Sequence, residues 1–311
     1  MSVVVLTGGV GGAKLVDGLA RILPPGEVTA IVNTGDDFVH LGLHISPDID
    51  SVFYLLAGKS DAERGWGVAN ESWRFMEMIG ELGGPTWFNL GDLDLAMHVM
   101  RTAALGTGKR LTDYTAEMAK EAGVGVNLLP MSECPVRTVL DTDAGVLAFQ
   151  NYFVQHQCNP KVARIRFDGA ADAKPTPEVV AALEGPSVEA IVIAPSNPYL
   201  SIDPILSIAA IKDALCSSRA PVVAVSPIVD GKAVKGPTAK LMSELGVEIS
   251  HGSIARHYSN LIDGLLVDEG TDLLRNSCPE VVVHSAHTMM REAADRMRVA
   301  RAVLDLAKAC K

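Results

Sequence analysis

The stretch from Val3 to Lys14, VVVLTGGVGGAK, predicts the fold of this chain. Its opening run, Val3–Leu6, is short, apolar and rich in β-branched valine, which is typical of a strand buried on both faces of a parallel sheet. Four glycines follow, and a helix is expected from about Lys14 to Leu23. A strand, a glycine loop and a helix in this order are typical of nucleotide-binding α/β folds.

The same alternation of apolar runs and helical segments returns along the chain. A second buried strand is expected at Val28–Val32. Later strands are expected at Ala190–Ala194, Val222–Val225 and Leu265–Val267, with helices near Ile205–Leu215 and Pro237–Leu245. We therefore predict an α/β fold with a Rossmann-like, doubly wound and mainly parallel sheet.

The middle of the chain departs from this alternation. Residues 49–122 are mostly helical in pattern, and strands at Val136–Leu140 and Val146–Tyr152 with a turn between them indicate a β-hairpin. We expect a single α/β domain over residues 1–311, with a helical and β-hairpin insertion at about 49–170. A helix at about 286–310 ends the chain and packs either on the core or at a subunit interface.

The composition limits the possible functions. Of 311 residues, 48% are hydrophobic and 21% are charged, and the formal net charge of −10 argues against a basic nucleic-acid-binding face. No apolar stretch approaches the roughly 18 residues of a membrane span. The five cysteines form no CxxC pair, which is typical of a reducing compartment. We expect a cytoplasmic protein with small-molecule ligands and with neither nucleic acid nor membrane as a partner.

The glycine loop, residues 7–14, is a candidate phosphate site. Gly9, Gly11 and Gly12 would let the backbone approach a phosphate closely, and the following helix would direct N–H groups toward it, with Lys14 nearby. The loop matches neither standard motif, because a dinucleotide-binding motif needs glycine or alanine at Lys14 and a Walker A loop needs glycine at Ala13. A tight strand-to-helix turn is the structural alternative.

Acidic residues follow the second predicted strand and begin the next helix. The segment 33–37, NTGDD, lies at the carboxyl end of a strand, where open α/β sheets bind ligands. Asp48 and Asp50 follow at a strong helix start, with Ser46 expected as the N-cap and Pro47 at the first helical position. Such oxygen ligands suit Mg²⁺ bound together with phosphates. Turn capping and the helix dipole explain the same acids without a ligand.

A polar helix face follows in the segment Asn89–Leu105. Asp94, His98, Arg101 and Thr102 are spaced so that they share one side of the helix. A solvent-facing helix explains such spacing. An arginine beside a histidine and an aspartate also suits a phosphate, which a guanidinium binds bidentately.

Two later loops follow buried strands and carry polar residues. Ser196 and Asn197 lie between two prolines, and Lys235 precedes a predicted helix, where an anion is favoured. Ordinary turns are the alternative for both loops. His284 and His287 are three residues apart, but no third zinc ligand accompanies them.

An ordered series of segments resembles the 2-phospho-L-lactate transferase and phosphoenolpyruvate transferase family of coenzyme F420 biosynthesis. The resemblance extends from the glycine loop to about Glu269. It is carried by GGVGGAKL, NTGDD, ISPDID, Trp66-Gly67, LGDLDLAMHVMRT, LPMS, PSNP with SIDPIL, and VVAVSPIVDGKAVKGP. Each segment is weak alone, but their order along the chain is specific.

The resemblance implies a Rossmann-like, Mg²⁺-dependent and homodimeric enzyme. Members of the family transfer a phospholactyl, phosphoenolpyruvyl or phosphoglyceryl group from a guanosine-diphospho donor to the terminal ribityl hydroxyl of the deazaflavin Fo, and they release GMP. By this resemblance the catalytic residues are Asp48 and Asp50, and the magnesium ligands are Asp36, Asp48 and Asp50. The nucleotide would contact Gly9, Gly11, Gly12, Lys14, Ser196, Asn197 and Lys235. The deazaflavin and the phosphate would lie near Asn33, Asp37, Asp92, Asp94, His98, Arg101 and Thr102.

Two positions depart from the family pattern. Glu133-Cys134 stands after LPMS where a pair of aspartates is common, and Val10 replaces a common threonine in the glycine loop. The alternative function is a non-catalytic, nucleotide-sugar-binding regulatory protein of related fold, which would need neither ISPDID nor the GDLDLAMHVMRT helix. A dinucleotide-dependent oxidoreductase rests on fold analogy alone, and the failed motif at Lys14 counts against it.

Overall fold

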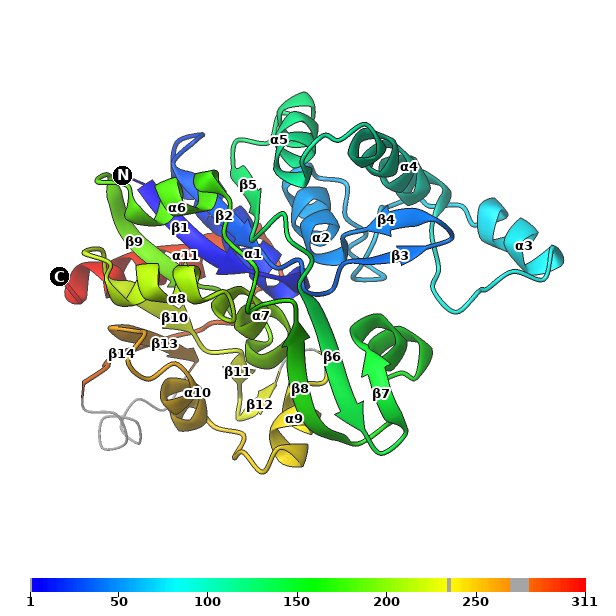
Figure 1. Cartoon of the computed structure of the whole chain (residues 1–311). Helices are drawn as coiled ribbons and strands as arrows, with labels where there is room; N and C mark the ends of the chain where they lie inside the picture. The colour runs from blue at the N-terminus through cyan, green and yellow to red at the C-terminus, as the bar shows by residue number, and fades with distance from the viewer. Residues whose placement is uncertain (1, 234–235, 269–279) are drawn as a thin grey trace.

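The computed structural model describes residues 2–233, 236–268 and 280–311. Its centre is a sheet of seven strands, all paired in parallel, in the order β14-β13-β10-β9-β1-β2-β5 (Figure 1). These strands are β1 (Ser2–Thr7), β2 (Val28–Val32), β5 (Asn127–Pro130), β9 (Val188–Ile193), β10 (Val222–Val225), β13 (Gly264–Asp268) and β14 (Val282–Ala286). From β1 the chain adds β2 and β5 on one side, and β9, β10, β13 and β14 on the other side, so the strand order reverses between β1 and β9. The predicted doubly wound α/β fold is confirmed.

Helices cover both faces of the sheet, and this explains the continuous apolar runs of its strands. Val3 and Val5 belong to one hydrophobic cluster, whereas Val4 and Leu6 belong to the other. The first cluster packs against α1 (Gly9–Ile22), α2 (Pro47–Leu56), α5 (Leu111–Glu121) and α11 (Ala293–Ala309). The second packs against α6 (Pro177–Glu184), η2 (Pro198–Ile202), α7 (Asp203–Leu206), α8 (Ala209–Cys216), α9 (Thr238–Glu244) and α10 (His251–His257).

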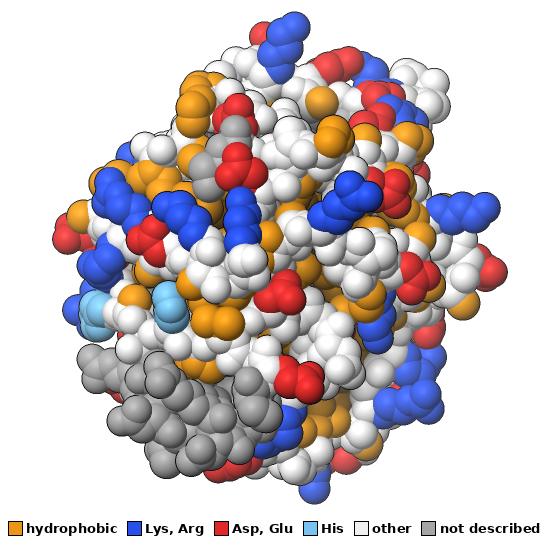
Figure 2. Space-filling model, turned by 90° about the vertical axis from the view of Figure 1, so that its left-hand side faces the viewer, with side chains coloured by type: hydrophobic (Ala, Val, Ile, Leu, Met, Phe, Trp, Pro, Cys, Tyr) orange, Lys and Arg blue, Asp and Glu red, His pale blue; other side chains and the backbone are white. Residues whose placement is uncertain are grey.

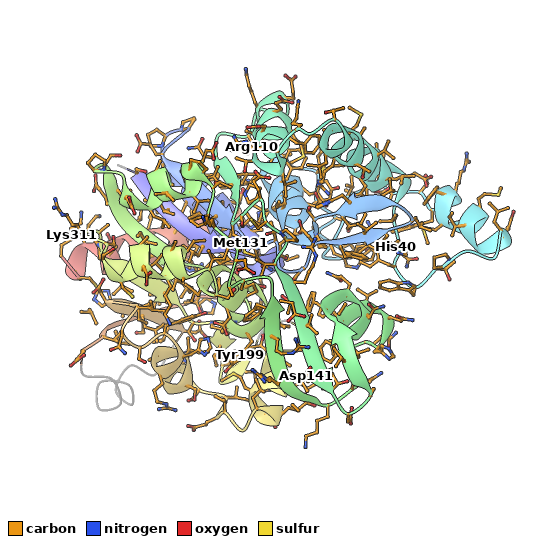
Figure 3. The ribbon with its side chains drawn as sticks, viewed as in Figure 1. His40, Arg110, Met131, Asp141, Tyr199 and Lys311 are labelled. Atoms are coloured by element: carbon orange, nitrogen blue, oxygen red, sulfur yellow. The ribbon has the colours of Figure 1, made fainter. Side chains whose placement is uncertain are left out.

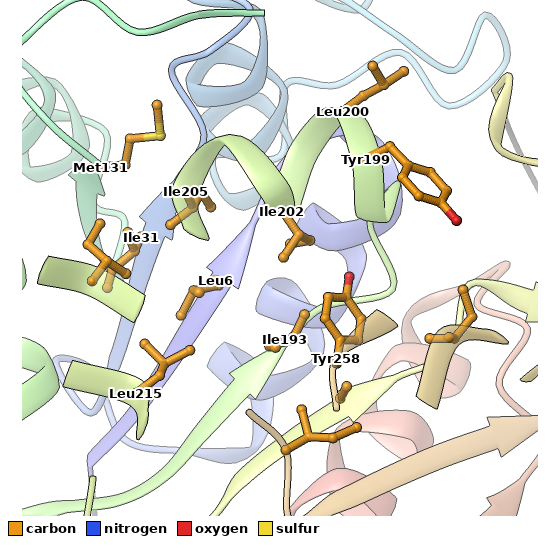
Figure 4. Close-up of a cluster of buried hydrophobic side chains, with 14 of the residues drawn as sticks. Leu6, Ile31, Met131, Ile193, Tyr199, Leu200, Ile202, Ile205, Leu215 and Tyr258 are labelled. Atoms are coloured by element: carbon orange, nitrogen blue, oxygen red, sulfur yellow. The ribbon is translucent and has the colours of Figure 1, made fainter. Parts of the chain in front are cut away.

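The second cluster shows how three neighbouring strands share one covering layer. In Figure 4, Leu6 of β1 and Ile193 of β9 face Ile202 and Ile205 from the helices above them, and Tyr258 closes the cluster. All of these side chains are almost completely buried. Burial on both faces favours apolar side chains along these strands, so most polar groups near the cavity come from the loops that follow the strands.

The remaining elements lie beyond the carboxyl ends of the strands. They are the hairpin β3 (Phe38–His40) and β4 (Leu43–Ile45), α3 (Arg74–Glu81), α4 (Asp92–Gly106), β6 (Arg137–Thr142), β7 (Gly145–Ala148), η1 (Asn151–Gln155), β8 (Val162–Asp168), β11 (Ile228–Val229) and β12 (Lys232–Ala233). The β3–β4 hairpin carries His40 and the antiparallel sheet β7-β6-β8 carries Asp141. Both extend from the same end of the main sheet (Figure 3). Residues 33–126 connect β2 to β5, its neighbour in the sheet.

Several predicted boundaries differ from the structure. Helix α1 begins at Gly9 rather than Lys14, so three glycines of the loop form its first turn. The strand predicted at Val146–Tyr152 ends at Ala148, because Phe149 and Tyr152 both turn inward at helical spacing and are buried. The helix predicted near Ile205–Leu215 is divided into α7 and α8.

The C-terminal region also differs from the prediction. The predicted helix at 286–310 begins at Ala293, and the preceding residues Val282–Ala286 form β14, an edge strand that the sequence did not indicate. An edge strand is buried less completely than a central one, and three of its five side chains are exposed. The apolar signal of a buried strand is therefore absent.

Within the described ranges, no helix has the length and apolar character needed to cross a membrane. On the face shown in Figure 2, basic and acidic side chains are interspersed rather than separated into single-sign patches.

A glycine determines how closely α1 and α11 approach. A Cβ placed on Gly18 would overlap the backbone carbonyl of Arg296. We expect Gly18→Ala to lower the free energy of unfolding by about 2 kcal/mol, because backbone atoms must move to accommodate the methyl group. Urea denaturation measures this loss. Gly106→Ala is the matched control, since no atom lies within 4 Å of its Cβ position. An equal loss in both variants would contradict the packing argument.

Candidate active site

A cavity of about 460 Å³ lies at the carboxyl ends of the strands, where the sheet reverses its order. One end is formed by the glycine loop after β1, by the PSNP loop after β9 (residues 195–198), and by Ser226 and Pro227 after β10. Residues 288–290, which precede α11, complete this end. A crevice at the strand-order reversal is the usual ligand site of a doubly wound sheet.

The glycine loop and the PSNP loop are in direct contact. The N–H of Gly8 donates to Ser196 Oγ at 3.2 Å, and that hydroxyl donates to the carbonyl of Gly8 at 2.8 Å. A Cβ on Gly12 would overlap the Oγ atoms of Thr7 and Ser196. Glycine at this position therefore allows the two loops to pack closely at one end of the cavity. A phosphate bound there could accept hydrogen bonds from the N-terminus of α1.

Two polar side chains of this end are oriented by the backbone. Asn197 Oδ1 accepts from the N–H groups of Tyr199 and Leu200, which leaves its Nδ2 buried without a partner among the described residues. Lys14 Nζ donates to the carbonyl of Met290 at 2.7 Å. Both residues line the cavity. Lys235 lies outside the described residues.

Three aspartates, Asp36, Asp48 and Asp50, form an acidic wall of the cavity. Asp48 accepts from the N–H of Gly9 at 2.7 Å and from Asn33 Nδ2 at 2.9 Å. Burial raises the pKa of Asp48 to about 6. Burial and the nearby charge of Asp48 raise the pKa of Asp36 well above its usual value, and Asp36 Oδ1 has no hydrogen-bond partner among the described residues. The wall is therefore a buried, partly unsatisfied group of carboxylates.

Asn33 and Asp37 lie behind this wall and do not line the cavity. Asn33 holds Asp48 through its Nδ2 and accepts from the N–H of Gly35 through its Oδ1 at 2.7 Å. Ser46 Oγ donates to Asp37 Oδ2 at 2.9 Å and makes no capping bond to α2. Ser46 is therefore the N-cap residue and Pro47 begins the helix, as predicted, but the Ser46 hydroxyl hydrogen-bonds Asp37 and not the backbone of α2.

The burial of Asp37 predicts a pH dependence of stability. Burial raises the pKa of Asp37 to about 8, from 3.8 in the unfolded chain. Between these values the folded chain holds a proton that the unfolded chain releases, so stability falls as pH rises through this window. We expect Asp37→Asn, measured by denaturation in EDTA, to flatten a slope of up to about 1.4 kcal/mol per pH unit. The exposed control Asp213→Asn should keep the wild-type slope, and an unchanged slope in Asp37→Asn would contradict the assignment.

The predicted polar face of α4 exists, but it is buried rather than solvent-exposed. Arg101 is fully buried and donates to both carboxylate oxygens of Asp50. His98 Nε2 lies 3.1 Å from Asp94 Oδ2, and the hydroxyl of Tyr54 donates to Asp94. Asp94 and His98 line the cavity, whereas Arg101 lies behind Asp50 and does not. The structure therefore places Arg101 against a carboxylate of this chain, not against the cavity.

Two other predicted residues of this segment lie away from the cavity. Thr102 Oγ1 accepts from the N–H of His44 at 2.8 Å and donates to the carbonyl of His98 at 2.7 Å. Asp92 accepts from the N–H of Phe75 and from Ser72, which anchors the start of α4 to the segment before α3. Both side chains have structural partners, and neither lines the cavity.

Aromatic side chains also line the cavity. Trp66, Phe88, Phe149 and Phe153 line it together with Gln150. Phe149 and Phe153 stack with their ring centroids 5.3 Å apart. Sequence reasoning missed these two residues because it assigned Phe149 to a strand. Their spacing of four residues was the available signal, since such residues share one side of a helix.

The acidic groups offer two places for a cation. Among the described residues, Asp50, Asp94 and His98 have ligand atoms within 4.8 Å of one another. However, Arg101 already supplies a positive charge there, through Asp50 and through Nδ1 of His98 at 3.4 Å. Asp36 and Asp48 have no such cation bonded to them, and each carboxylate opposes the ionisation of its neighbours. Among the described residues, only Asp50, Asp94 and His98 form a group of three with such spacing, so Asp36 and Asp48 would need phosphate oxygens beside them to complete a cation site.

The two weaker signals have structural explanations. Glu133 accepts from the N–H groups of Leu111 and Thr112 and so caps α5, away from the cavity. The imidazole of His287 is largely exposed, and its Nδ1 lies 3.7 Å from Asp268. Within the described part of the chain, no third ligand joins His284 and His287.

Comparison with known proteins identifies the family of this chain. The profile of the 2-phospho-L-lactate transferase CofD family matches residues 3–303. A phosphoenolpyruvate transferase from Streptomyces griseus is 41% identical over 274 residues, which cover 86% of each chain. A 2-phospho-L-lactate transferase from Methanosarcina mazei is 38% identical over 266 residues, also 86% of each chain.

A solved structure supports the fold independently of sequence. Protein BH3568 from Bacillus halodurans is 19% identical and superposes with a TM-score of 0.64, covering 97% of this chain and 99% of its own. This likeness bears on the α/β architecture alone. The match of the family profile over nearly the whole chain shows that the protein is a transferase of the 2-phospho-L-lactate transferase CofD family.

Proposed function

We propose that this protein transfers a phospho-acid group from a guanosine-diphospho donor to the terminal ribityl hydroxyl of the deazaflavin Fo in coenzyme F420 biosynthesis, with release of GMP. The group is phospholactyl, phosphoenolpyruvyl or phosphoglyceryl. The names of the relatives support a transferase of phospholactate or phosphoenolpyruvate. One observation carries the proposal: the glycine loop, the acidic wall and four aromatic side chains line one and the same cavity.

Each part of the cavity has a place in this reaction. The diphosphate lies at the glycine loop, where the α1 N-terminus and Lys14 favour an anion. The planar deazaflavin lies among Trp66, Phe88 and the stacked Phe149 and Phe153, which offer ring faces and edges for stacking. The ribityl chain then runs toward the acidic wall, and its hydroxyl meets the diphosphate there.

The reaction is one displacement at phosphorus. The hydroxyl oxygen bonds to the phosphorus that carries the acid, the bond from that phosphorus to the bridging oxygen breaks, and GMP leaves. The hydroxyl proton passes to a carboxylate of the wall. Asp48 suits this step because its pKa of about 6 is close to neutral pH, while both oxygens of Asp50 already accept from Arg101. Such transfers depend mainly on positioning and on charge neutralisation.

Magnesium is part of the proposal. Asp36 and Asp48, with Asp50 beside them, would hold Mg²⁺, and the unpartnered Oδ1 of Asp36 supports this assignment. The bound ion would neutralise charge on the diphosphate. Without a cation, the negative charges of the diphosphate and of the acidic wall would repel each other inside the cavity.

A homodimer in the cytoplasm completes the proposal. Helices α3 and α4 expose the large apolar side chains Met78, Leu93 and Met100, and Leu82 directly after α3 is also exposed, which suits a subunit interface. The resemblance to the family implies the dimer. The described cysteines are all unpaired, as expected in a reducing compartment.

Deazaflavin fluorescence tests the proposal directly. Fo is titrated with the protein, with and without GDP and Mg²⁺, and a guanosine-diphospho-lactate donor is then added. We expect micromolar binding that responds to GDP, followed by formation of GMP. Binding of GDP without any binding of Fo would instead favour the nucleotide-sugar-binding regulatory protein. That function shares the glycine loop and the acidic turn at residues 33–37, but it needs neither the ISPDID segment nor the GDLDLAMHVMRT helix.

A further inference from the structure

A small second pocket of about 100 Å³ adjoins the cavity. It lies between α1, α2, the loop 60–67 and the start of α11. Lys14, Ser51, Tyr54 and Trp66 line both the pocket and the cavity, so the two spaces meet along these residues. We propose that this pocket binds the carboxylate of the transferred acid, an inference that rests on the proposed function.

The charges that line the pocket favour an anion. Lys14, Arg291 and Arg296 contribute three positive charges, against Asp61 in the pocket and Asp17, which pairs with Arg296 from outside it. Asp61 is already paired with Arg64 at 3.1 Å and accepts N–H groups of its own loop. The pocket therefore carries a net positive charge inside an acidic protein.

Both arginines have donors available for a ligand. Arg296 donates through Nη1 to Asp17 at 3.0 Å, but its Nε is buried and has no partner among the described residues. The guanidinium of Arg291 is exposed and makes no hydrogen bond to another described side chain. A buried donor without a partner is costly, and a carboxylate bound in the pocket could accept from it.

The position of the pocket matches the far end of the donor. The guanosine and the acid lie at opposite ends of the diphosphate. Ser51, which follows Asp50 of the acidic wall, lines the pocket, and Lys14 extends from the glycine loop. An acid bonded to the reacting phosphorus is therefore next to this pocket. Phospholactate and phosphoenolpyruvate both carry a carboxylate on the carbon that bears the phosphate oxygen, so one cationic pocket serves either acid.

The test compares a donor with and without its carboxylate charge. Guanosine-diphospho-lactate, its methyl ester and GDP are titrated into the full chain with Mg²⁺ by calorimetry, in the absence of Fo. We expect the wild type to bind the free acid about tenfold more tightly than the ester, as one charge-assisted hydrogen bond provides. Arg291→Ala should weaken binding of the acid about tenfold and leave the ester and GDP unchanged. Arg291→Lys should restore part of the difference.

The controls separate this inference from the function itself. Arg301→Ala removes an exposed arginine of α11 that lines neither space and should change nothing. If the wild type transfers the group to Fo but binds acid and ester equally, the pocket assignment is wrong and the function stands. If the wild type binds the donor and distinguishes acid from ester but never transfers to Fo, the function is wrong. Loss of GDP binding in Arg291→Ala would also overturn the assignment.

Discussion

Asp48→Asn is expected to lower the rate of transfer about a thousandfold while the chain keeps its fold. Asp48 is the carboxylate at which the glycine loop, Asn33 and the acidic wall meet. Asparagine has the same shape and can still accept from the N–H of Gly9, but it can neither take a proton nor bring a negative charge to a metal. The introduced amide loses the hydrogen bond from Asn33 Nδ2, but burial raises the pKa of Asp48 to about 6, so removal of its buried charge offsets that loss above this pH.

The assay for Asp48→Asn separates its two possible roles. The initial rate is measured against Mg²⁺ concentration and against pH from 5 to 9, with the exposed Asp172→Asn as the matched control. A large rise in the Mg²⁺ concentration for half-maximal rate assigns Asp48 to the metal. If kcat no longer rises with pH while the Mg²⁺ requirement is unchanged, Asp48 is the group that accepts the hydroxyl proton. Full activity in the folded variant would refute both roles and, with them, the acidic wall as the reacting site.

Arg101→Met is expected to have the largest effect on stability, a loss of about 3–5 kcal/mol. Arg101 is fully buried and donates to both oxygens of Asp50. Removal of the guanidinium leaves the buried carboxylate of Asp50 charged, with little solvent around it and no arginine bonded to it. Breaking a buried ion pair in this way destabilises a protein strongly, even where replacing the whole pair by apolar residues would cost little. Asp50 would also lose the group that fixes its orientation in the cavity, so transfer should fall with stability.

A double-mutant cycle checks this interpretation. Arg101→Met, Asp50→Asn and the double variant are unfolded in urea. We expect the double variant to lose at least about 2 kcal/mol less unfolding free energy than the two single losses added together. Arg110→Met is the control, because Arg110 pairs with Asp113 and Glu178 at the surface, where an ion pair contributes less than about 1 kcal/mol. A similar loss in Arg101→Met and Arg110→Met would show that burial of the Asp50 pair is not decisive.

The main sheet could be predicted from sequence because its signal is local. Val3–Leu6, Val28–Val32 and Val222–Val225 are apolar without interruption, and strands covered on both faces require such runs. β5 and β14 at the two edges were not predicted, because an edge strand does not need a continuous apolar run. The position of the glycine loop after β1 was also evident, since glycine spacing and the strand before it are both local features.

The candidate site was predicted only in part. Asp36, Asp48 and Asp50 were placed together from their positions at a strand end and a helix start, and all three line the cavity. Arg101 was predicted at a phosphate, but it contacts Asp50, which lies 51 residues before it in sequence. Helical spacing places Arg101 on one side of α4, but it does not show which element that side faces.

The sequence by itself determined the strand–loop–helix start, the alternation that specifies a parallel sheet, and the residue types that can bind a diphosphate. These depend on backbone propensity and on periodicity, which act over a few residues. Only the tertiary structure decided that Asp37 and Asn33 lie behind the acidic wall, that Arg101 neutralises Asp50, and that Lys14 meets Arg291 and Arg296 at a second pocket. Burial and charge pairing depend on which distant segments the fold brings together, so no local pattern encodes them.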